Sequence, residues 1–270
     1  MHINTISSSS NALLKRIRGL HERKNREKSG TFLIEGAKGI AEAFAKGVRI
    51  RDLVVSESYW KQDGASLSGQ DIDVVSVVDD KLMKEMSTQT TPAGILATAD
   101  MPSFAWDALF QGGDGKPPLV VIVHSIQDPG NLGTIFRTAL AASASGVVCT
   151  RGTVDLFNPK VVRAASGALF GMPCVWDVPF EDVVAEVRGR GVRVVAMEPA
   201  GSVSLFEADL SGPVAIVLGN EGQGFSPEDL QLVDEQVSIP MNPASESLNV
   251  AICGAIVLFN VVQQRSKTTN

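Results

Sequence analysis

Short apolar runs alternate with stretches of helical periodicity in the second half of the sequence, and this alternation constrains the fold most. The run Leu119–Ser125 is mostly apolar, as in a strand that a parallel sheet buries on both faces. Comparable runs predict strands at 146–150, 174–178, 193–197 and 214–219, with helices between them. Such alternation predicts an α/β fold with a mostly parallel sheet covered by helices. In sheets of this kind ligands bind at the carboxyl ends of the strands.

A smaller αβ region precedes this sheet and begins with a single basic helix, expected over residues 10–25. Its expected strands are 31–35, 51–56, 73–78 and 94–99. The joint between the two regions is rich in glycine and proline, which mark turns and linkers. The 270 residues correspond to about two domains at roughly 150 residues each. We therefore predict a first domain at 1–110, a linker at 111–118 and a second domain at 119–270.

Positive charge is concentrated at the N-terminal end, although the whole chain carries a formal net charge of −6. Residues 1–51 hold 11 Lys and Arg against four acidic residues, a local net charge of +7. The other 219 residues hold 13 basic and 26 acidic residues, which gives −13. This asymmetry predicts that the basic end contacts a polyanion such as RNA, while a solvated helix face is the alternative. The candidate RNA-binding residues are Lys15, Arg16, Arg18, Arg23, Lys24 and Arg26.

The cysteines and the most apolar segment favour a cytoplasmic protein without a metal site. Cys149, Cys174 and Cys253 are far apart and lack the spacing of zinc ligands, so we expect buried free thiols in a reducing compartment. The N-terminus lacks the apolar core of a signal peptide. The most apolar stretch, Leu248–Val262, is shorter than the roughly 18 residues that span a bilayer. No association with a membrane is therefore expected.

Three polar loops follow expected strands and are the candidate ligand-binding segments. The first, Asp128–Ala139, contains Asn131 as a candidate helix cap and Arg137 almost two turns later. The third, Ile239–Asn249, leads into the final apolar helix and supplies hydroxyl and amide groups at the start of that helix. Taken alone, each of these loops also fits an ordinary helix start.

The second loop, Val217–Ser226, has three glycines within six positions, which allow backbone N–H groups to approach a ligand closely. It nearly matches the phosphate-binding pattern GxxxxGK[ST], but Phe225 occupies the lysine position. The glycines are spaced GxxGxG, whereas dinucleotide sites use GxGxxG. An ATPase and a nicotinamide-dependent oxidoreductase are therefore both disfavoured. Glu221 in this loop would repel phosphate and favours a cationic or hydroxyl-bearing ligand.

Together the three loops resemble the motifs of the SpoU (TrmH-type) branch of the SPOUT superfamily, whose members are S-adenosylmethionine-dependent RNA 2′-O-ribose methyltransferases. The motif residues are Asn131, Gly133, Arg137, Thr138 and Ala139 in the first loop, Gly219, Glu221, Gly222 and Gly224 in the second, and Ile239, Pro240, Met241, Ser245, Ser247, Leu248 and Asn249 in the third. The N-terminal stretch, with Arg23–Lys24 and Phe32–Gly36, is similar to the small ribosomal-protein-like substrate-binding domain of the family.

The resemblance implies a C-terminal domain whose chain forms a trefoil knot, binds S-adenosylmethionine among the knotted loops and pairs as a homodimer, with sites near the subunit interface. The cofactor-binding residues that it implies are Leu218, Gly219, Asn220, Gly222, Gly224, Ile239, Pro240, Met241, Ser247 and Leu248. The catalytic-site residues that it implies are Arg137, Asn131, Glu221, Ser247 and Asn249.

Methyl transfer to a ribose hydroxyl requires orientation of that hydroxyl and stabilisation of its developing charge, and it needs no metal. A guanidinium with a pKa above about 12 is a poor base, so we expect Arg137 to bind a phosphate and stabilise the 2′-alkoxide. Ribosomal RNA is the expected substrate, because the N-terminal domain resembles those of rRNA-modifying members. A tRNA substrate and a non-catalytic RNA-binding protein of the same fold are the alternatives. His124 at a strand end, and the helix start at 158–163, are either substrate contacts or structural residues.

Overall fold

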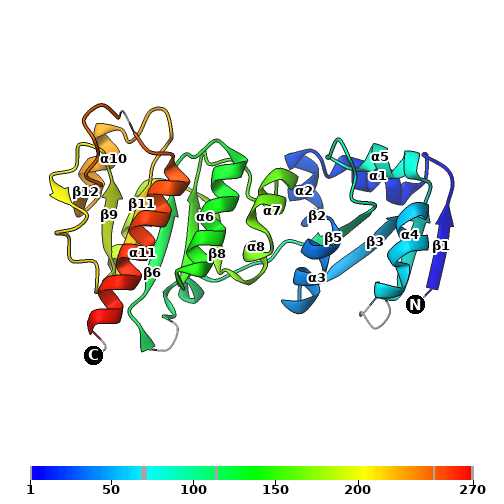
Figure 1. The fold of residues 1–270 in the computed structure, drawn as a ribbon, viewed down its shortest axis with the longest axis horizontal. Coiled ribbons are helices and arrows are strands. Elements are labelled where there is room, and N and C mark those ends of the chain that lie inside the picture. The colour runs from blue at the N-terminus through cyan, green and yellow to red at the C-terminus, as the bar shows by residue number, and fades with distance from the viewer. Residues whose placement is uncertain (1, 68–71, 113–114, 246, 269–270) are drawn as a thin grey trace. The chain divides into compact units, whose positions relative to one another are not determined.

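The chain contains two compact units, each with its own sheet and its own apolar core (Figure 1). The computed structural model describes residues 2–67, 72–112, 115–245 and 247–268. Unit 1 comprises Met1–Pro102 together with Phe157–Gly171. Unit 2 comprises Ser103–Leu156 and Met172–Asn270.

The described part of unit 1 contains a five-stranded sheet in the order β1-β4-β3-β5-β2. The strands are β1 (His2–Ile6), β2 (Thr31–Glu35), β3 (Ile50–Ser56), β4 (Val74–Val78) and β5 (Ile95–Asp100). Strands β1, β4 and β3 are parallel, whereas β5 runs antiparallel to β3 and β2. Strand β1 was not predicted, because its side chains are mostly polar and exposed and its pairing with β4 is a long-range contact.

The predicted basic helix over residues 10–25 is wrong, because the segment forms two helices, α1 (Ala12–Gly19) and α2 (Arg23–Ser29). The Arg26 guanidinium is buried and donates to the carbonyl oxygens of Leu20 (2.5 Å) and His21 (2.9 Å), which holds the turn between the helices. The remaining helices of unit 1 are α3 (Ala37–Ala45), α4 (Glu57–Asp63), α5 (Asp80–Met86), α7 (Pro159–Ala165) and α8 (Ala168–Gly171), with a 3₁₀ turn η1 (Gly64–Leu67).

In the described residues of unit 2, seven parallel strands form one sheet in the order β10-β12-β9-β11-β6-β7-β8. They are β6 (Leu119–Val123), β7 (Gly146–Thr150), β8 (Cys174–Val178), β9 (Arg193–Met197), β10 (Val203–Ser204), β11 (Val214–Leu218) and β12 (Glu235–Ser238). The predicted α/β fold with a parallel sheet is confirmed. Strands β6 and β11 lie side by side although almost a hundred residues separate them, so the loops after both strands meet at one edge of the sheet.

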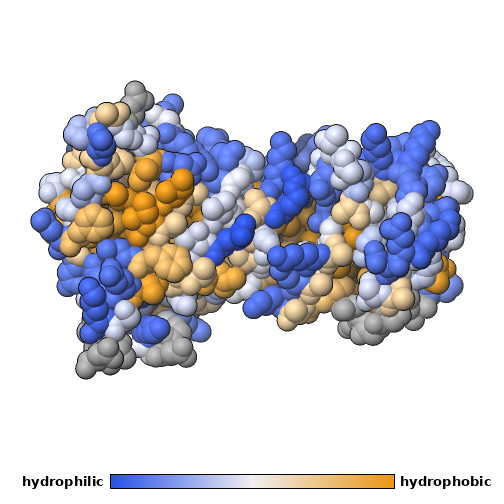
Figure 2. Space-filling view, viewed as in Figure 1, coloured by the Kyte–Doolittle hydropathy of each residue, from blue (hydrophilic) through white to orange (hydrophobic). Residues whose placement is uncertain are grey.

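Helices cover both faces of this sheet. The helices are α6 (Pro129–Ala141), α9 (Phe180–Gly189), α10 (Pro227–Leu232) and α11 (Val250–Thr268). Helices α6 and α11 pack against each other on the near face in Figure 1. A Cβ atom at Gly254 would lie 2.9 Å from Leu218 Cδ1, so glycine at this position allows α11 to approach β11 closely. The outer surface of α11 carries exposed apolar side chains, which Figure 2 shows as an apolar patch.

The limits of the two units differ from the predicted domain limits in two places. The 3₁₀ turn η2 (Trp106–Phe110) belongs to unit 2, where Leu109 is buried in the core beside β6 and β7. The segment Phe157–Gly171 belongs to unit 1, where α7 packs against β2 and the Phe157 ring lies 5.0 Å from the Phe32 ring. The contact of Phe157 with Phe32 joins segments that are far apart in the sequence. The limits 1–110, 111–118 and 119–270 stay a prediction.

Three further features of the described residues bear on function. Their helices include none that combines the length and the apolar character required to cross a membrane. Their His, Cys, Asp and Glu side chains form no group of three that could hold a metal ion. All three cysteines are free thiols, and burial raises the pKa of Cys174 to about 12.

Candidate functional site

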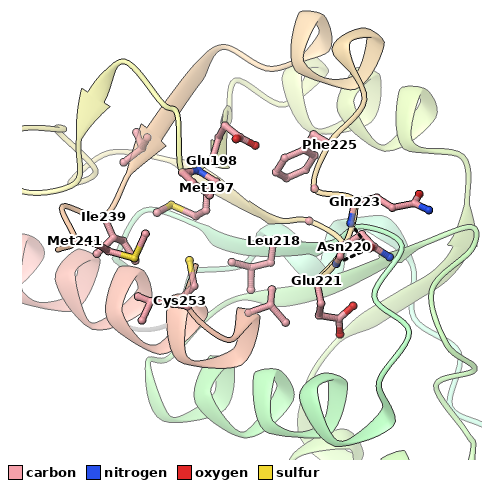
Figure 3. A pocket seen from close by; sticks show the side chains of 17 residues that line it. Met197, Glu198, Leu218, Asn220, Glu221, Gln223, Phe225, Ile239, Met241 and Cys253 are labelled. Atoms are coloured by element: carbon pink, nitrogen blue, oxygen red, sulfur yellow. Dashed lines mark hydrogen bonds between the residues drawn. The ribbon is translucent and has the colours of Figure 1, made fainter. Parts of the chain in front are cut away.

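A cavity of about 270 Å³ lies at the carboxyl ends of β9, β11 and β12 in unit 2 (Figure 3). Its walls come from the end of β9, the loop after β11, the segment after β12 and the start of α11. The predicted cofactor residues that line it are Leu218, Gly219, Asn220, Gly222, Gly224, Ile239, Met241 and Leu248. Pro240 and Ser247 lie in the third loop and are exposed, outside the lining that the described residues form. The cavity therefore brings the second and third predicted loops together.

The cavity also contains residues that sequence reasoning missed. Met197 and Glu198 stand at the end of β9, and Figure 3 shows Glu198 on the same side of the cavity as Phe225. Cys253, on the first turn of α11, lines it as well, and burial raises the pKa of its thiol to about 11. Glu198 directly follows a predicted strand, but only the structure shows that this strand pairs with β11 and so places Glu198 at the cavity.

The loop after β11 is held in one conformation by its own side chains. Asn220 Oδ1 accepts hydrogen bonds from the backbone N–H groups of Gly222 and Gln223, both at 2.9 Å, and its Nδ2 donates to the carbonyl oxygen of Ser125 at 2.7 Å. A Cβ atom at Gly219 would lie 2.8 Å from the Phe225 ring, so only glycine fits there without displacing that ring. The loop is thus a preformed wall of the cavity.

Three side chains, one from each predicted loop, form a hydrogen-bonded chain beside the cavity. Asn131 Nδ2 donates to Glu221 Oε1 at 2.9 Å, and Asn249 Nδ2 donates to Asn131 Oδ1 at 3.0 Å. Asn249 Oδ1 in turn accepts from the backbone N–H groups of Ala251 (2.9 Å) and Ile252 (3.3 Å), which caps α11. The amide of Asn131 therefore connects the carboxylate of the second loop to the helix cap of the third.

Arg137 and Ser247, two of the five predicted catalytic-site residues, stand apart from this chain. Arg137 is exposed on α6, two turns beyond Asn131, and it does not line the cavity. Within the described residues it has no ion pair. The side chain of Ser247 is also exposed. Within one chain, Asn131, Glu221 and Asn249 thus lie together, whereas the Arg137 side chain is exposed and is not part of this group.

His124, at the end of β6, is a structural residue by its contacts. Its ring Nδ1 lies 3.1 Å from Thr150 Oγ1 and its Nε2 lies 3.4 Å from Asp229 Oδ2. The ring packs 4.5 Å from Phe180 and 5.9 Å from Phe225, measured between ring centroids. Burial lowers the pKa of His124, although the neighbouring Asp229 opposes that effect. The ring therefore packs against Phe225, which lines the cavity.

The predicted basic strip of unit 1 is largely paired. Arg16 lies 2.7 Å from Asp52, Arg18 lies 3.1 Å from Glu85, and Arg23 lies 2.6 Å from Glu27, measured between nitrogen and carboxylate oxygen. Arg26 is 2% exposed and binds backbone carbonyls, so its guanidinium is used inside the unit. Lys15 and Lys24 are exposed, and no ion pair involves them in the part of the chain that the structure describes. Asn158, considered above as an RNA contact, caps α7 by accepting from Lys160 N at 2.9 Å.

Two family models match the chain. Residues 118–259 match the SpoU rRNA Methylase family, and residues 11–97 match the MRM3-like substrate binding domain. Among curated proteins, the chain is 31% identical over 257 residues to the 23S rRNA (guanosine(2553)-2′-O)-methyltransferase RlmP of Bacillus subtilis, covering 95% of this chain and 98% of that protein.

Solved structures are similar over almost the whole chain. The structure of an AdoMet-bound rRNA methyltransferase from Sinorhizobium meliloti has a TM-score of 0.83 and 32% identity, and the match covers 97% of this chain and 98% of that one. The SpoU methyltransferase AviRb from Streptomyces viridochromogenes, in complex with AdoMet, has a TM-score of 0.86 and 27% identity, with coverage of 95% and 98%.

Proposed function

The chain belongs to the SpoU rRNA methylase family, and from this premise we propose that it transfers a methyl group from S-adenosylmethionine to a ribose 2′-hydroxyl of ribosomal RNA. The single observation that carries the proposal is that the second and third predicted loops line one cavity, while Asn131 of the first loop is hydrogen-bonded to Glu221 and Asn249 beside it. RlmP of Bacillus subtilis is named as an enzyme of this reaction, and the two similar structures contain AdoMet.

The lining of the cavity suits S-adenosylmethionine in polarity and in charge. Leu218, Ile239, Met241 and Leu248 provide an apolar part suited to the adenine ring. Gly219 lines the cavity, and the Phe225 ring occupies the space that a Cβ atom would need, so only glycine fits at this wall. The Glu198 and Glu221 carboxylates suit a ligand that carries positive charge. When bound, the cofactor supplies a methyl group on a sulfonium.

The residues of the chain would orient and stabilise the reacting hydroxyl. The Glu221–Asn131–Asn249 chain keeps the three loops in register, so that a ribose at the cavity mouth meets groups whose positions are fixed in advance. Arg137 carries a permanent positive charge, which would bind the neighbouring phosphate and stabilise the 2′-alkoxide as it forms. We propose these roles for Glu221, Asn131, Asn249 and Arg137. Ser247 belongs to the same loop as Asn249, and we propose that it helps to position the reactants.

We also propose that a second copy of the chain covers the outer face of α6 and α11. Leu140 (42% exposed), Ile252 (53%) and Phe259 (49%) are large apolar side chains on these two helices. Exposed apolar surface of this kind marks an interaction site. Arg137 lies three residues before Leu140 and thus on the same side of α6, which would place its guanidinium at the edge of this interface.

Replacement of Phe259 by Asp tests the dimer. We expect the variant to sediment as a monomer, because burial of a carboxylate in an apolar interface is unfavourable. An unchanged thermal unfolding temperature would show that each subunit remains folded. A variant that sediments as the wild type would exclude this face as the interface.

Two experiments test the activity and its substrate. Calorimetric titration with S-adenosylmethionine, followed by methyl transfer to unmodified rRNA and tRNA, separates an enzyme from a non-catalytic RNA-binding protein. Mapping of 2′-O-methyl sites in RNA from cells that lack the protein then identifies the nucleotide. We expect one rRNA site to lose its methyl group, and loss of a tRNA methyl group instead would favour the tRNA alternative. The cytoplasmic location and the trefoil knot stay predictions.

A further inference from the structure

Unit 1 contains a separate cavity of about 290 Å³, distinct from the site in unit 2. It lies at the carboxyl ends of two parallel strands, β3, which ends at Ser56, and β4, which is followed by Asp79 and α5. The segment Pro92–Gly94, just before β5, forms another of its walls. The carboxyl ends of parallel strands are the common place for ligands in α/β sheets, so this cavity is a candidate binding site.

Four side chains give this cavity the chemistry of a nucleobase pocket. Tyr59 and Gln62 come from α4, and Asp80 and Lys84 come from α5. Unpaired bases in RNA stack on aromatic rings and form hydrogen bonds along their Watson–Crick edges. An aromatic ring, an amide and a carboxylate supply these contacts, and an ammonium group beside them suits the adjoining phosphate.

The cavity is built from groups that hold one another in place. Ser58 Oγ donates to Asp80 Oδ2 at 2.6 Å, and the Tyr59 backbone N–H donates to Ser56 Oγ at 3.1 Å. Hydrogen bonds from Ser58 and Ser56 lower the pKa of Asp80. Gly94 has a φ of +76°, and a Cβ atom there would lie 3.0 Å from Tyr59 Cβ. Glycine thus permits the wall to pack directly against the tyrosine.

Glu35 fixes the segment that leads into this wall. Its carboxylate accepts hydrogen bonds from Ser87 Oγ (2.5 Å), from Thr88 N (3.0 Å) and from the Thr88 hydroxyl. These contacts hold the residues between α5 and Pro92, so the cavity is shaped before any ligand arrives. Such preorganisation reduces the entropy lost on binding.

The charge around the cavity also favours RNA. Lys84 is exposed, and in the described residues no carboxylate lies within ion-pair distance of it, whereas Arg16, Arg18 and Arg23 elsewhere in unit 1 are paired with acids. A lysine without a partner retains its full charge for a phosphate. The cavity thus combines base-binding groups with an available cation.

We propose that this cavity binds one unpaired nucleobase of the RNA substrate and prefers guanine or uracil. Both bases carry a ring N–H on the Watson–Crick edge, which can donate to the Asp80 carboxylate. Adenine and cytosine present a ring nitrogen acceptor at the same place, which a carboxylate repels. The inference rests on the proposed function, because that function supplies the RNA.

The single tyrosine of the chain makes a direct test possible, because 3-fluorotyrosine introduced at Tyr59 gives one ¹⁹F resonance. Seven-nucleotide RNA strands of cytidine with a variable central base serve as ligands. We expect guanine or uracil at the centre to shift this resonance with an affinity at least about fivefold higher than adenine or cytosine. The same strands in a duplex should leave it unchanged. The absence of a shift with every single strand, or an equal shift with duplexes, would overturn the proposal.

Two lysines on α5 provide a matched pair of variants. Lys84→Ala should weaken binding of all four strands about fivefold, because Lys84 lines the cavity. Lys81→Ala, on the same helix but outside the cavity lining, should leave binding unchanged. Asp80→Asn should abolish the preference among bases, because an amide offers both a donor and an acceptor. Equal effects of the two lysine variants would contradict the proposal.

The proposed function and this inference fail in distinguishable ways. Binding of S-adenosylmethionine and methyl transfer are measured on the wild-type protein, and they do not depend on the ¹⁹F signal. A base-dependent shift without methyl transfer would refute the proposed activity and support the cavity. Methyl transfer to rRNA without any shift of the ¹⁹F resonance would support the proposed activity and refute base binding in this cavity.

Discussion

Polar side chains are used in opposite ways in the two units. In unit 2, Asn131, Glu221 and Asn249 come from three distant loops and bind one another beside a cavity. In unit 1, most of the basic residues that stand out in the sequence are bound to acids or to backbone carbonyls of the same unit. The loop motifs name residues that meet in the folded chain, so they predict a site. A count of charges predicts a site less well, because folding places acidic residues such as Asp52 and Glu85 next to the basic ones.

The largest effect is expected from Arg137→Ala in unit 2. Removal of a charge that stabilises the transition state should lower the rate of methyl transfer by about 10²- to 10³-fold. Affinity for S-adenosylmethionine should stay unchanged, because Arg137 lies outside the cavity lining of its own chain. Single-turnover kinetics and calorimetry measure the two quantities separately. Near-normal turnover would remove Arg137 from the mechanism.

A smaller effect, on cofactor affinity, is expected from Gly219→Val. The new side chain would collide with the Phe225 ring at the wall of the cavity, and overpacking of this size typically costs about 1–3 kcal/mol. The dissociation constant for S-adenosylmethionine should therefore rise about 10- to 100-fold. Gly212→Val is the matched control, because nothing lies within 4 Å of a Cβ atom at Gly212. If both variants bound the cofactor equally well, the loop would not be the cofactor wall.

The sequence predicted the convergence of the three loops better than it predicted the identity of every lining residue. Gly219 and Ile239 were predicted through the resemblance to the SpoU motifs, and the parallel sheet places the loops that contain them at one edge. Glu198 and Phe225 were missed as ligand-facing residues because their roles depend on which strands are neighbours, and the pairing of β9 with β11 is not written in local periodicity. Arg137 is exposed and does not line the cavity, and this too depends on how α6 packs in the unit.

In unit 1, the same reasoning failed where long-range contacts determine local structure. The break between α1 and α2 depends on the Arg26 guanidinium, which reaches back to carbonyls five and six residues earlier. The apolar periodicity of α1 ends at Leu20, and the polar residues after it do not show that a second helix begins at Arg23. Residues 157–171 belong to unit 1, where the Phe157 ring packs against the Phe32 ring. No local sequence pattern indicates this contact.

The contrast between buried and exposed basic residues can be measured with Arg26→Ala and Lys24→Ala. Loss of the Arg26 guanidinium leaves the carbonyl oxygens of Leu20 and His21 without this donor, so the free energy of unfolding should fall by about 1–3 kcal/mol. Lys24 is exposed on the same helix, and its replacement should change that free energy by less than about 0.5 kcal/mol. Urea denaturation compares the two variants. Equal destabilisation would mean that Arg26 does not hold the turn.

The smallest effect concerns the salt dependence of RNA binding. Lys15 and Lys24 have no ion pair in the part of the chain that the structure describes, so each retains its charge for a phosphate. The double variant Lys15→Ala/Lys24→Ala should reduce the slope of log affinity against log salt by about 1.4, at roughly 0.7 per contact with single-stranded RNA. Arg16→Ala/Arg23→Ala removes the same charge from residues whose guanidinium groups are paired with Asp52 and Glu27, and it should change the slope less. Filter binding at several salt concentrations measures both slopes. If the two double variants changed the slope equally, the net charge of unit 1, and not the pairing of its basic residues with acids, would determine the salt dependence of RNA binding.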